Sequence, residues 1–269
     1  MRISEINIYP VKSLKGISLN EAVVEDRGLQ LDRRWMLVDD ANQFMTQREF
    51  PAMARIEVTA DKSGLTVSID GRMLEIPVVP DTGNLEIVTV WNSKVGVIVY
   101  DNDVNQWFSE ILQSDCRLVL MTEASKRKVN PDYAVRKYHD TVSFADGYPF
   151  MLIGENSLAD LNSRLAVPLP MNRFRPNMVV SGSDIFAEDT WKKIRIGTTI
   201  FHIVKPSERC VITTIDQARG EKDGKEPLKT LATYRNQNGG VMFGQNLIAE
   251  NPGEVIKIGD RVEVVEMQV

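Results

Sequence analysis

The residue with the clearest capacity for chemistry is Cys210, which directly follows Arg209 and lies close to Lys205 along the chain. A neighbouring cation favours the thiolate over the thiol, and a thiolate is both a nucleophile and a ligand for soft metals. The alternative is a small buried residue, which is what most lone cysteines are. The second cysteine, Cys116, lies between a predicted helix and an apolar strand, and we expect it in the core.

Three basic segments carry the groups that an anion site needs. Lys12 and Ser13 lie in a loop after the first predicted strand and offer a point charge and a hydroxyl donor. Arg33 offers a planar guanidinium that matches phosphate oxygens. The third segment contains two arginines and two asparagines, among them Arg175 and Asn177. Each segment by itself is more typical of a solvated surface turn.

Two further positions leave their role open. Asp146 begins a turn, where it is either a turn-stabilising carboxylate or a group that handles a proton. Gly244 interrupts an apolar strand, which is consistent with a bulge or with backbone that passes close to a ligand. The histidines, His139 and His202, are too few and too isolated for most zinc chemistry, and two cysteines exclude sites built from four thiolates.

The elements that must position these residues are mostly short strands. A hairpin is predicted from residues 55–60 and 65–70 around Lys62, Ser63 and Gly64. Helices are predicted after Asp103 as a plausible N-cap, from near Ser157, and from Glu226 to Arg235. Later strands are predicted at Met178 to Ser181, Thr199 to Val204, Val211 to Ile215, Val241 to Ala249 and Arg261 to Val265.

We therefore predict a mainly β fold with a few helices. A smaller unit, either a β-barrel or a sandwich, is expected over residues 1–95, and a larger β-rich unit that carries the helices over residues 96–269. The boundary between them is soft, and the first strand can pack on the second unit.

Net charge and hydropathy argue against nucleic-acid-binding and membrane-spanning proteins. The formal net charge is −5, which argues against nucleic-acid binding. No apolar run approaches the roughly 18 residues that a membrane span needs, and the N-terminus lacks the apolar core of a signal peptide. We expect a cytoplasmic protein that binds neither nucleic acid nor membrane.

Taken together and in this order, the segments resemble the MOSC family, which is named for the C-terminal domain of molybdenum cofactor sulfurase. They are most similar to the subgroup with an added N-terminal β-barrel, which includes the mitochondrial amidoxime-reducing component and the bacterial YcbX-type reductases. The matching stretches span nearly the whole chain: Tyr9 to Ser13, Gly28 to Val38, Pro149 to Asn162, Phe174 to Asn177, Arg209-Cys210 with Thr213-Thr214, Lys225 to Leu228, Phe243 to Gln245, and Gly259-Asp260.

The resemblance implies a molybdenum cofactor, with the metal held by a pterin dithiolene and by the thiolate of Cys210. It places Asp146 at an acidic position near the metal, although Gly147 and Tyr148 stand where the mitochondrial relatives carry small hydroxyl residues. The residues that would hold the pterin part and its phosphate are Lys12, Ser13, Arg33, Arg175, Asn177 and Arg209.

The implied reaction is the two-electron reduction of N-hydroxylated compounds (hydroxylamines, amidoximes and N-hydroxylated bases) to amines. Electrons would come from an iron–sulfur or flavin protein, or from a C-terminal ferredoxin domain of the kind that some relatives carry and that this chain lacks. One alternative is a carrier that holds sulfur or the cofactor on Cys210 without turnover. Another is a metal-independent cysteine nucleophile, which needs a base. Pyridoxal phosphate is disfavoured, because no lysine marks a Schiff-base site.

Overall fold

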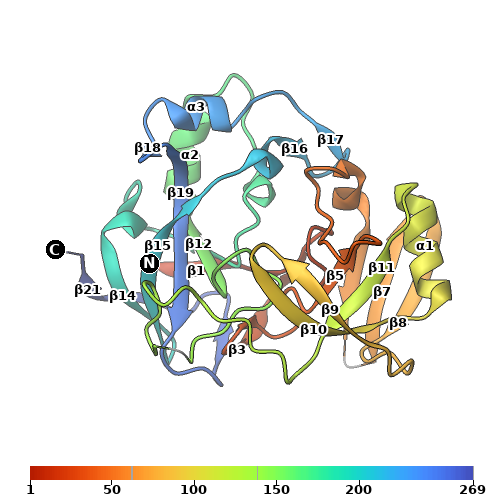
Figure 1. Cartoon of the computed structure of the whole chain (residues 1–269). Coiled ribbons are helices and arrows are strands. Elements are labelled where there is room, and N and C mark those ends of the chain that lie inside the picture. Colours follow the sequence, from red (N-terminus) through yellow and green to blue (C-terminus); the bar gives the residue numbers. More distant parts are fainter. Residues whose placement is uncertain (62, 138, 269) are drawn as a thin grey trace.

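The computed structural model describes residues 1–61, 63–137 and 139–268. Figure 1 shows a mainly β molecule in which two β-rich bodies lie side by side, with both termini on the body that holds the largest sheet. That sheet has the order β2-β1-β13-β12-β19-β15-β14-β21, with β18 paired to β19. Its strands are β1 (Arg2–Ile8), β2 (Ile17–Leu19), β12 (Phe150–Gly154), β13 (Met178–Ser181), β14 (Trp191–Ile196), β15 (Thr199–Glu208), β18 (Asn236–Gln237), β19 (Gly240–Ala249) and β21 (Val262–Met267).

The second body is built around a four-stranded sheet of order β5-β11-β10-β9 and a three-stranded sheet of order β6-β7-β8. Helix α1 packs against strand β11 and β8. These elements are β5 (Trp35–Val38), β6 (Glu57–Ala60), β7 (Gly64–Ile69), β8 (Arg72–Pro77), β9 (Leu85–Val90), β10 (Ser93–Val99), α1 (Asn102–Leu112) and β11 (Arg117–Met121). The predicted hairpin is present as β6 and β7, while Lys62 of its turn lies outside the described residues.

The start of the chain is part of the larger body. Strand β1 pairs antiparallel with β13, and its buried Ile3, Ile6 and Ile8 join the core of that body. Strand β3 (Glu21–Glu25) pairs with β4 (Gly28–Leu29) and with β20 (Val255–Lys257), which lies near the other end of the sequence. The division of the chain at residue 95 stays a prediction.

Two predicted helices differ in their bounds. Helix α1 begins two residues earlier than predicted, because Asp101 and not Asp103 is its N-cap: the Asp101 carboxylate accepts a hydrogen bond from the backbone N–H of Val104. Helix α2 (Glu155–Ser163) lies where it was predicted. Helix α3 (Leu228–Ala232) is shorter than predicted at both ends, with Pro227 as its N-cap and Thr233 as its C-cap.

The predicted strand from Val211 to Ile215 is wrong. Val211–Thr214 form a 3-10 turn, and only Ile215–Asp216 (β16) are extended, paired with Glu221–Lys222 (β17). The threonine side chains explain the difference, since Thr213 Oγ1 and Thr214 Oγ1 donate to carbonyls three residues earlier. Within the described residues, no helix is both long enough and apolar enough to cross a bilayer.

The glycine in β19 marks a close approach of two strands. Gly244 has a φ of 81°, and a Cβ at this position would lie 2.9 Å from the carbonyl oxygen of Leu152 in β12. The packing of β19 on β12 therefore accounts for this glycine without a ligand.

Candidate functional site

A cavity of about 260 Å³ is lined by all eight residues that the sequence analysis assigned to the metal or the cofactor. Its lining comes from segments far apart in the chain, including the loop after β1, the loops before β12 and β13, and the end of β15. The predicted residues that line it are Lys12, Ser13, Arg33, Asp146, Arg175, Asn177, Arg209 and Cys210. The lining contains six basic side chains and two carboxylates, so the pocket is strongly positive in an acidic protein.

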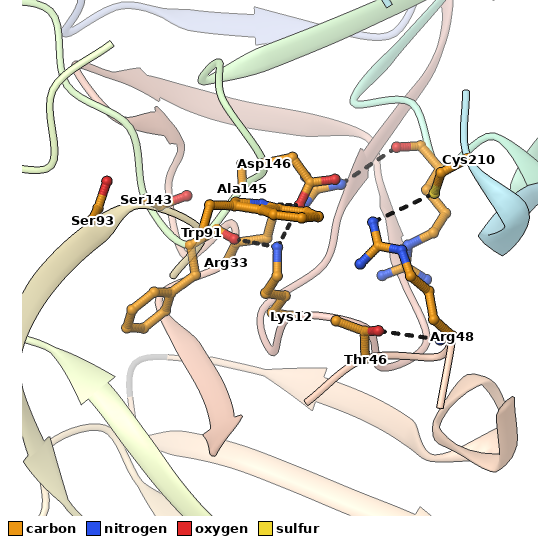
Figure 2. A network of polar contacts seen from close by, with 12 residues as sticks. Lys12, Arg33, Thr46, Arg48, Trp91, Ser93, Ser143, Ala145, Asp146 and Cys210 are labelled. Atoms are coloured by element: carbon orange, nitrogen blue, oxygen red, sulfur yellow. Dashed lines mark hydrogen bonds and ion pairs between the residues drawn. The ribbon is translucent and has the colours of Figure 1, made fainter. Parts of the chain in front are cut away.

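Cys210 lies at the point where β15 ends and the 3-10 turn begins. It is a free, partly exposed cysteine, and its carbonyl accepts bonds from the backbone N–H and the Oγ1 of Thr213, which fix the turn. Arg48 Nη2 donates to Cys210 Sγ across 3.5 Å, a contact that Figure 2 shows. Lys205 also lines the pocket, but its Nζ lies 5.0 Å from the ring centroid of Tyr133.

Cys116 has the opposite environment, and its predicted place in the core is confirmed. It is 3 % exposed, and its Sγ lies 3.7 Å from Ser109 Oγ. Burial raises the pKa of the Cys116 thiol to about 11, so this sulfur stays a neutral thiol at physiological pH.

A stack of three side chains forms the basic wall. Two guanidinium groups pack against the ring of Tyr9, with Arg33 at 4.5 Å and Arg175 at 4.2 Å from the ring centroid. Arg33 Nη1 also donates to the buried carboxylate of Asp32, which in turn accepts from the backbone N–H of Tyr9. The wall therefore holds two positive charges close together on an aromatic support.

Three residues of this wall and its neighbourhood adopt an unusual backbone. Ser13, Arg33 and Arg175 have φ values of 68°, 51° and 54°. Residues other than glycine adopt this left-handed backbone conformation at a cost of about 1–2 kcal/mol each. Such conformations cluster at functional sites, where the surrounding structure holds a side chain in a required direction. Here they direct a hydroxyl and two guanidinium groups to one cavity.

Lys12 and Asp146 form an ion pair at the centre of the lining. Lys12 Nζ donates to Asp146 Oδ1 at 2.6 Å and to the carbonyl of Phe144 at 2.8 Å. Desolvation lowers the pKa of the buried Lys12, and the carboxylate opposes that change. Desolvation also disfavours ionised Asp146, but the charges of Lys12 and Arg48 outweigh it and hold the pKa of Asp146 well below its usual range. Asp146 is therefore a carboxylate at neutral pH, where it accepts hydrogen bonds and does not donate a proton.

Arg209 and Asn177, the remaining two predicted residues, differ in how many of their polar atoms already have hydrogen-bond partners. Arg209 donates to Ser207 Oγ and to the carbonyl of Phe174, while its buried Nε has no hydrogen-bond partner among the described residues. Asn177 uses its side-chain amide to bridge strands: its Oδ1 accepts from Met151 N, and its Nδ2 donates to Asn7 O. Arg209 thus has a donor without a partner, whereas Asn177 chiefly links β1 and β12 across the start of β13, which lies between them.

Three side chains that organise the site are not predicted from the sequence. Arg48 contacts the sulfur, Trp91 Nε1 donates to Asp146 Oδ1 at 3.2 Å, and both come from loops without a recognisable motif. Arg127, 8 % exposed, donates to the carbonyls of Ser143, Ala145 and Asp146 and so fixes the loop that carries the carboxylate. A lone arginine in a polar stretch gives no signal for such a role.

The described residues that line the pocket include neither histidine. His202 Nε2 instead lies 2.7 Å from Glu250 on the outer part of the large sheet. The described residues also form no cluster of three or more His, Cys, Asp or Glu side chains that could hold a metal ion. Cys210 therefore has no imidazole base beside it, and any metal at this sulfur needs ligands from a cofactor as well.

Comparison with known proteins identifies the family of this chain. The family model for the MOSC N-terminal beta barrel domain matches residues 1–115, and that for the MOSC domain matches residues 139–263. Mitochondrial amidoxime-reducing component 1 of Mus musculus is 35% identical over 97% of this chain and 81% of its own length, and the Homo sapiens protein is 34% identical over 97% and 82%. Molybdenum cofactor sulfurase of Oryza sativa is 33% identical over 91% of this chain, which spans 32% of that longer protein. The chain thus belongs to the MOSC family, with an N-terminal MOSC β-barrel domain and a MOSC domain.

Proposed function

We propose that this protein is a molybdenum-cofactor-dependent oxidoreductase that reduces N-hydroxylated compounds to amines. The observation that carries the proposal is the partly exposed Cys210 in a strongly basic pocket. The similarity to proteins named amidoxime-reducing components, over 97% of the chain, supports the substrate class.

The donor set of the pocket fits this cofactor. A cysteine sulfur is the soft ligand that a metal bound by dithiolene sulfurs accepts. Lys12, Arg33 and Arg175 offer cations, and Ser13 a hydroxyl, for the phosphate. The buried, unpartnered Nε of Arg209 is a further donor that a bound group can satisfy. When bound, the cofactor supplies the two-electron chemistry that cleaves an N–O bond.

The chain's own residues then bind and orient the reactants. The Asp146 side chain is 61% exposed and faces the pocket, so it can accept a hydrogen bond from an N–H or O–H of a hydroxylamine or amidoxime. Lys12 and Arg48 keep this carboxylate ionised, and Arg127 fixes the loop that carries it. Arg48, against Cys210, compensates negative charge that develops at the sulfur end of the pocket.

The electrons are proposed to come from an iron–sulfur or flavin protein, and the proposed compartment is the cytoplasm. The competing function is that of a carrier, in which Cys210 holds sulfur or the cofactor without turnover. The similarity to a molybdenum cofactor sulfurase makes this the alternative to test.

Metal analysis and a reductase assay on the same preparation separate the two functions. The chain is produced in a host that makes the cofactor, and the assay supplies a hydroxylamine or benzamidoxime with a chemically reduced dye as donor. Stoichiometric molybdenum together with amine formation supports the enzyme. Molybdenum without turnover of either substrate supports the carrier, and a preparation that binds no molybdenum overturns the proposal.

A further inference from the structure

The tip of the β9–β10 hairpin carries a tryptophan where a turn residue is expected. Val90 pairs with Ser93, so Trp91 and Asn92 form a two-residue turn. Trp91 has a φ of 52° and is 44 % exposed. Asn or Gly is the usual choice at such a position, and a bulky side chain there is an outlier. Neither turn geometry nor core packing explains this residue.

Trp91 contacts two residues that line the pocket, Asp146 and Arg48. Its Nε1 donates to Asp146 Oδ1 at 3.2 Å, and the guanidinium carbon of Arg48 lies 4.9 Å from its ring. Phe44 supports the indole from a centroid distance of 5.0 Å. Figure 2 shows the indole beside Asp146 and above Lys12, with Arg48 reaching from the other side to Cys210.

Arg48 has few other supports. Among the ion pairs formed by the described residues, none involves Arg48, and the hydrogen bond to Thr46 Oγ1 comes from its backbone N–H. The guanidinium is therefore held by the indole face, by the sulfur that it contacts and by attraction to the Asp146 carboxylate. An arginine stacked on an aromatic ring keeps its charge while losing freedom, which is how a flexible side chain is positioned.

We propose that Trp91 is a positioning residue of this site, with its ring face holding Arg48 against Cys210 Sγ and its indole N–H holding the Asp146 carboxylate. The β9–β10 hairpin thereby positions a positive charge next to the sulfur of Cys210, which directly follows strand β15 of the large sheet. The catalytic consequence rests on the proposed function, whereas the contacts themselves can be tested without any reductase activity.

The test compares two alkylating reagents on the whole chain, purified from a host that does not make the cofactor. Iodoacetate is anionic and iodoacetamide is neutral, but both react with the same thiolate, so the ratio of their rates at Cys210 cancels the ionisation of the sulfur and reports the positive charge beside it. Mass spectrometry of the peptide containing Cys210 separates it from Cys116.

We expect Arg48→Ala to lower this ratio by about three- to fivefold, as removal of a unit charge a few ångströms away from the sulfur would. Trp91→Leu and Trp91→Ala should each lower the rate ratio to a similar extent. Trp91→Phe keeps a ring face for Arg48, so its rate ratio should stay close to that of the native chain. In the Arg48→Ala background the Trp91 variants should have no further effect, because Trp91 acts through Arg48.

Ile87→Ala, an exposed residue of the same hairpin, is the matched control and should leave the ratio unchanged. An unchanged ratio in whichever of the Leu and Ala variants folds overturns the proposal. The proposal is also overturned if a Trp91 variant lowers the rate ratio in the Arg48→Ala background by as much as it does in the native chain. Because no outcome depends on turnover, a failed reductase assay would count against the proposed function and not against this role of Trp91.

Discussion

Lys12 Nζ and Asp146 Oδ1 lie 2.6 Å apart, although 134 residues separate them in the sequence. Lys12 comes from the loop after β1 and Asp146 from the loop before β12. The pair forms because β1 and β12 are both neighbours of β13 in the large sheet. The topology of that sheet, and not any local motif, therefore brings the two charged loops to one pocket.

The basic wall leads to a prediction about cofactor retention. Lys12→Ala and Arg175→Ala each remove a cation that is desolvated in the pocket and that we assign to the phosphate of the cofactor. A charge-assisted hydrogen bond contributes about 1.5–3 kcal/mol, so each variant should retain the cofactor at least about tenfold more weakly. Molybdenum and pterin content after dialysis measures this.

The control for these variants is Lys257→Ala, which removes an exposed cation paired with Glu21 outside the pocket. It makes the same change in net charge and should leave occupancy normal. If Lys12→Ala and Arg175→Ala also retained normal occupancy, the phosphate would have to bind elsewhere.

The two cysteines give a second prediction, because they have opposite environments. Cys210→Ser replaces the proposed soft ligand with a hard hydroxyl, so reductase activity should fall to background and metal retention should weaken. Cys116→Ser buries a hydroxyl in the core next to Ser109 and should cost about 1–2 kcal/mol of stability while activity is kept. Activity assays and thermal melts of both variants measure these effects. Full activity in Cys210→Ser would contradict the metal–thiolate assignment.

The fold class could be predicted from the sequence because alternation and turn signals are local. The apolar pattern at Ile3, Ile6 and Ile8 identifies a strand, and the same residues are buried in β1. The strand predicted directly after Cys210 is wrong for an equally local reason. The apolar residues of this segment favour a strand, but the hydroxyls of Thr213 and Thr214 close a 3-10 turn.

The eight candidate site residues could be named because the resemblance covers nearly the whole chain, and the structure places all of them around one cavity. Arg48, Trp91 and Arg127 could not be named. Each acts through a contact with a residue distant in sequence, and such contacts depend on tertiary pairing that leaves no periodic or motif signal. Tyr9 belongs to a matching stretch, but its contact with two guanidinium groups depends on the tertiary structure and leaves no signal in the sequence.

The buried carboxyl of Glu188 gives a final prediction, about pH. It is 0 % exposed behind β12, where it accepts hydrogen bonds from Gly154 N at 3.0 Å and Ser157 Oγ at 2.9 Å. Burial raises the pKa of Glu188 above its ordinary value of 4.5, so the stability that its protonated form contributes is fully present below that value and is lost as pH rises through the folded-state pKa. Glu188→Gln cannot ionise in this pH range. It keeps an acceptor for Gly154 N, at the cost of placing an amide donor where the carboxylate accepts from Ser157 Oγ. Melting temperatures from acid to neutral pH should therefore show the native chain losing stability relative to Glu188→Gln as pH rises, whereas parallel curves would mean that this carboxyl titrates as it does in the unfolded chain.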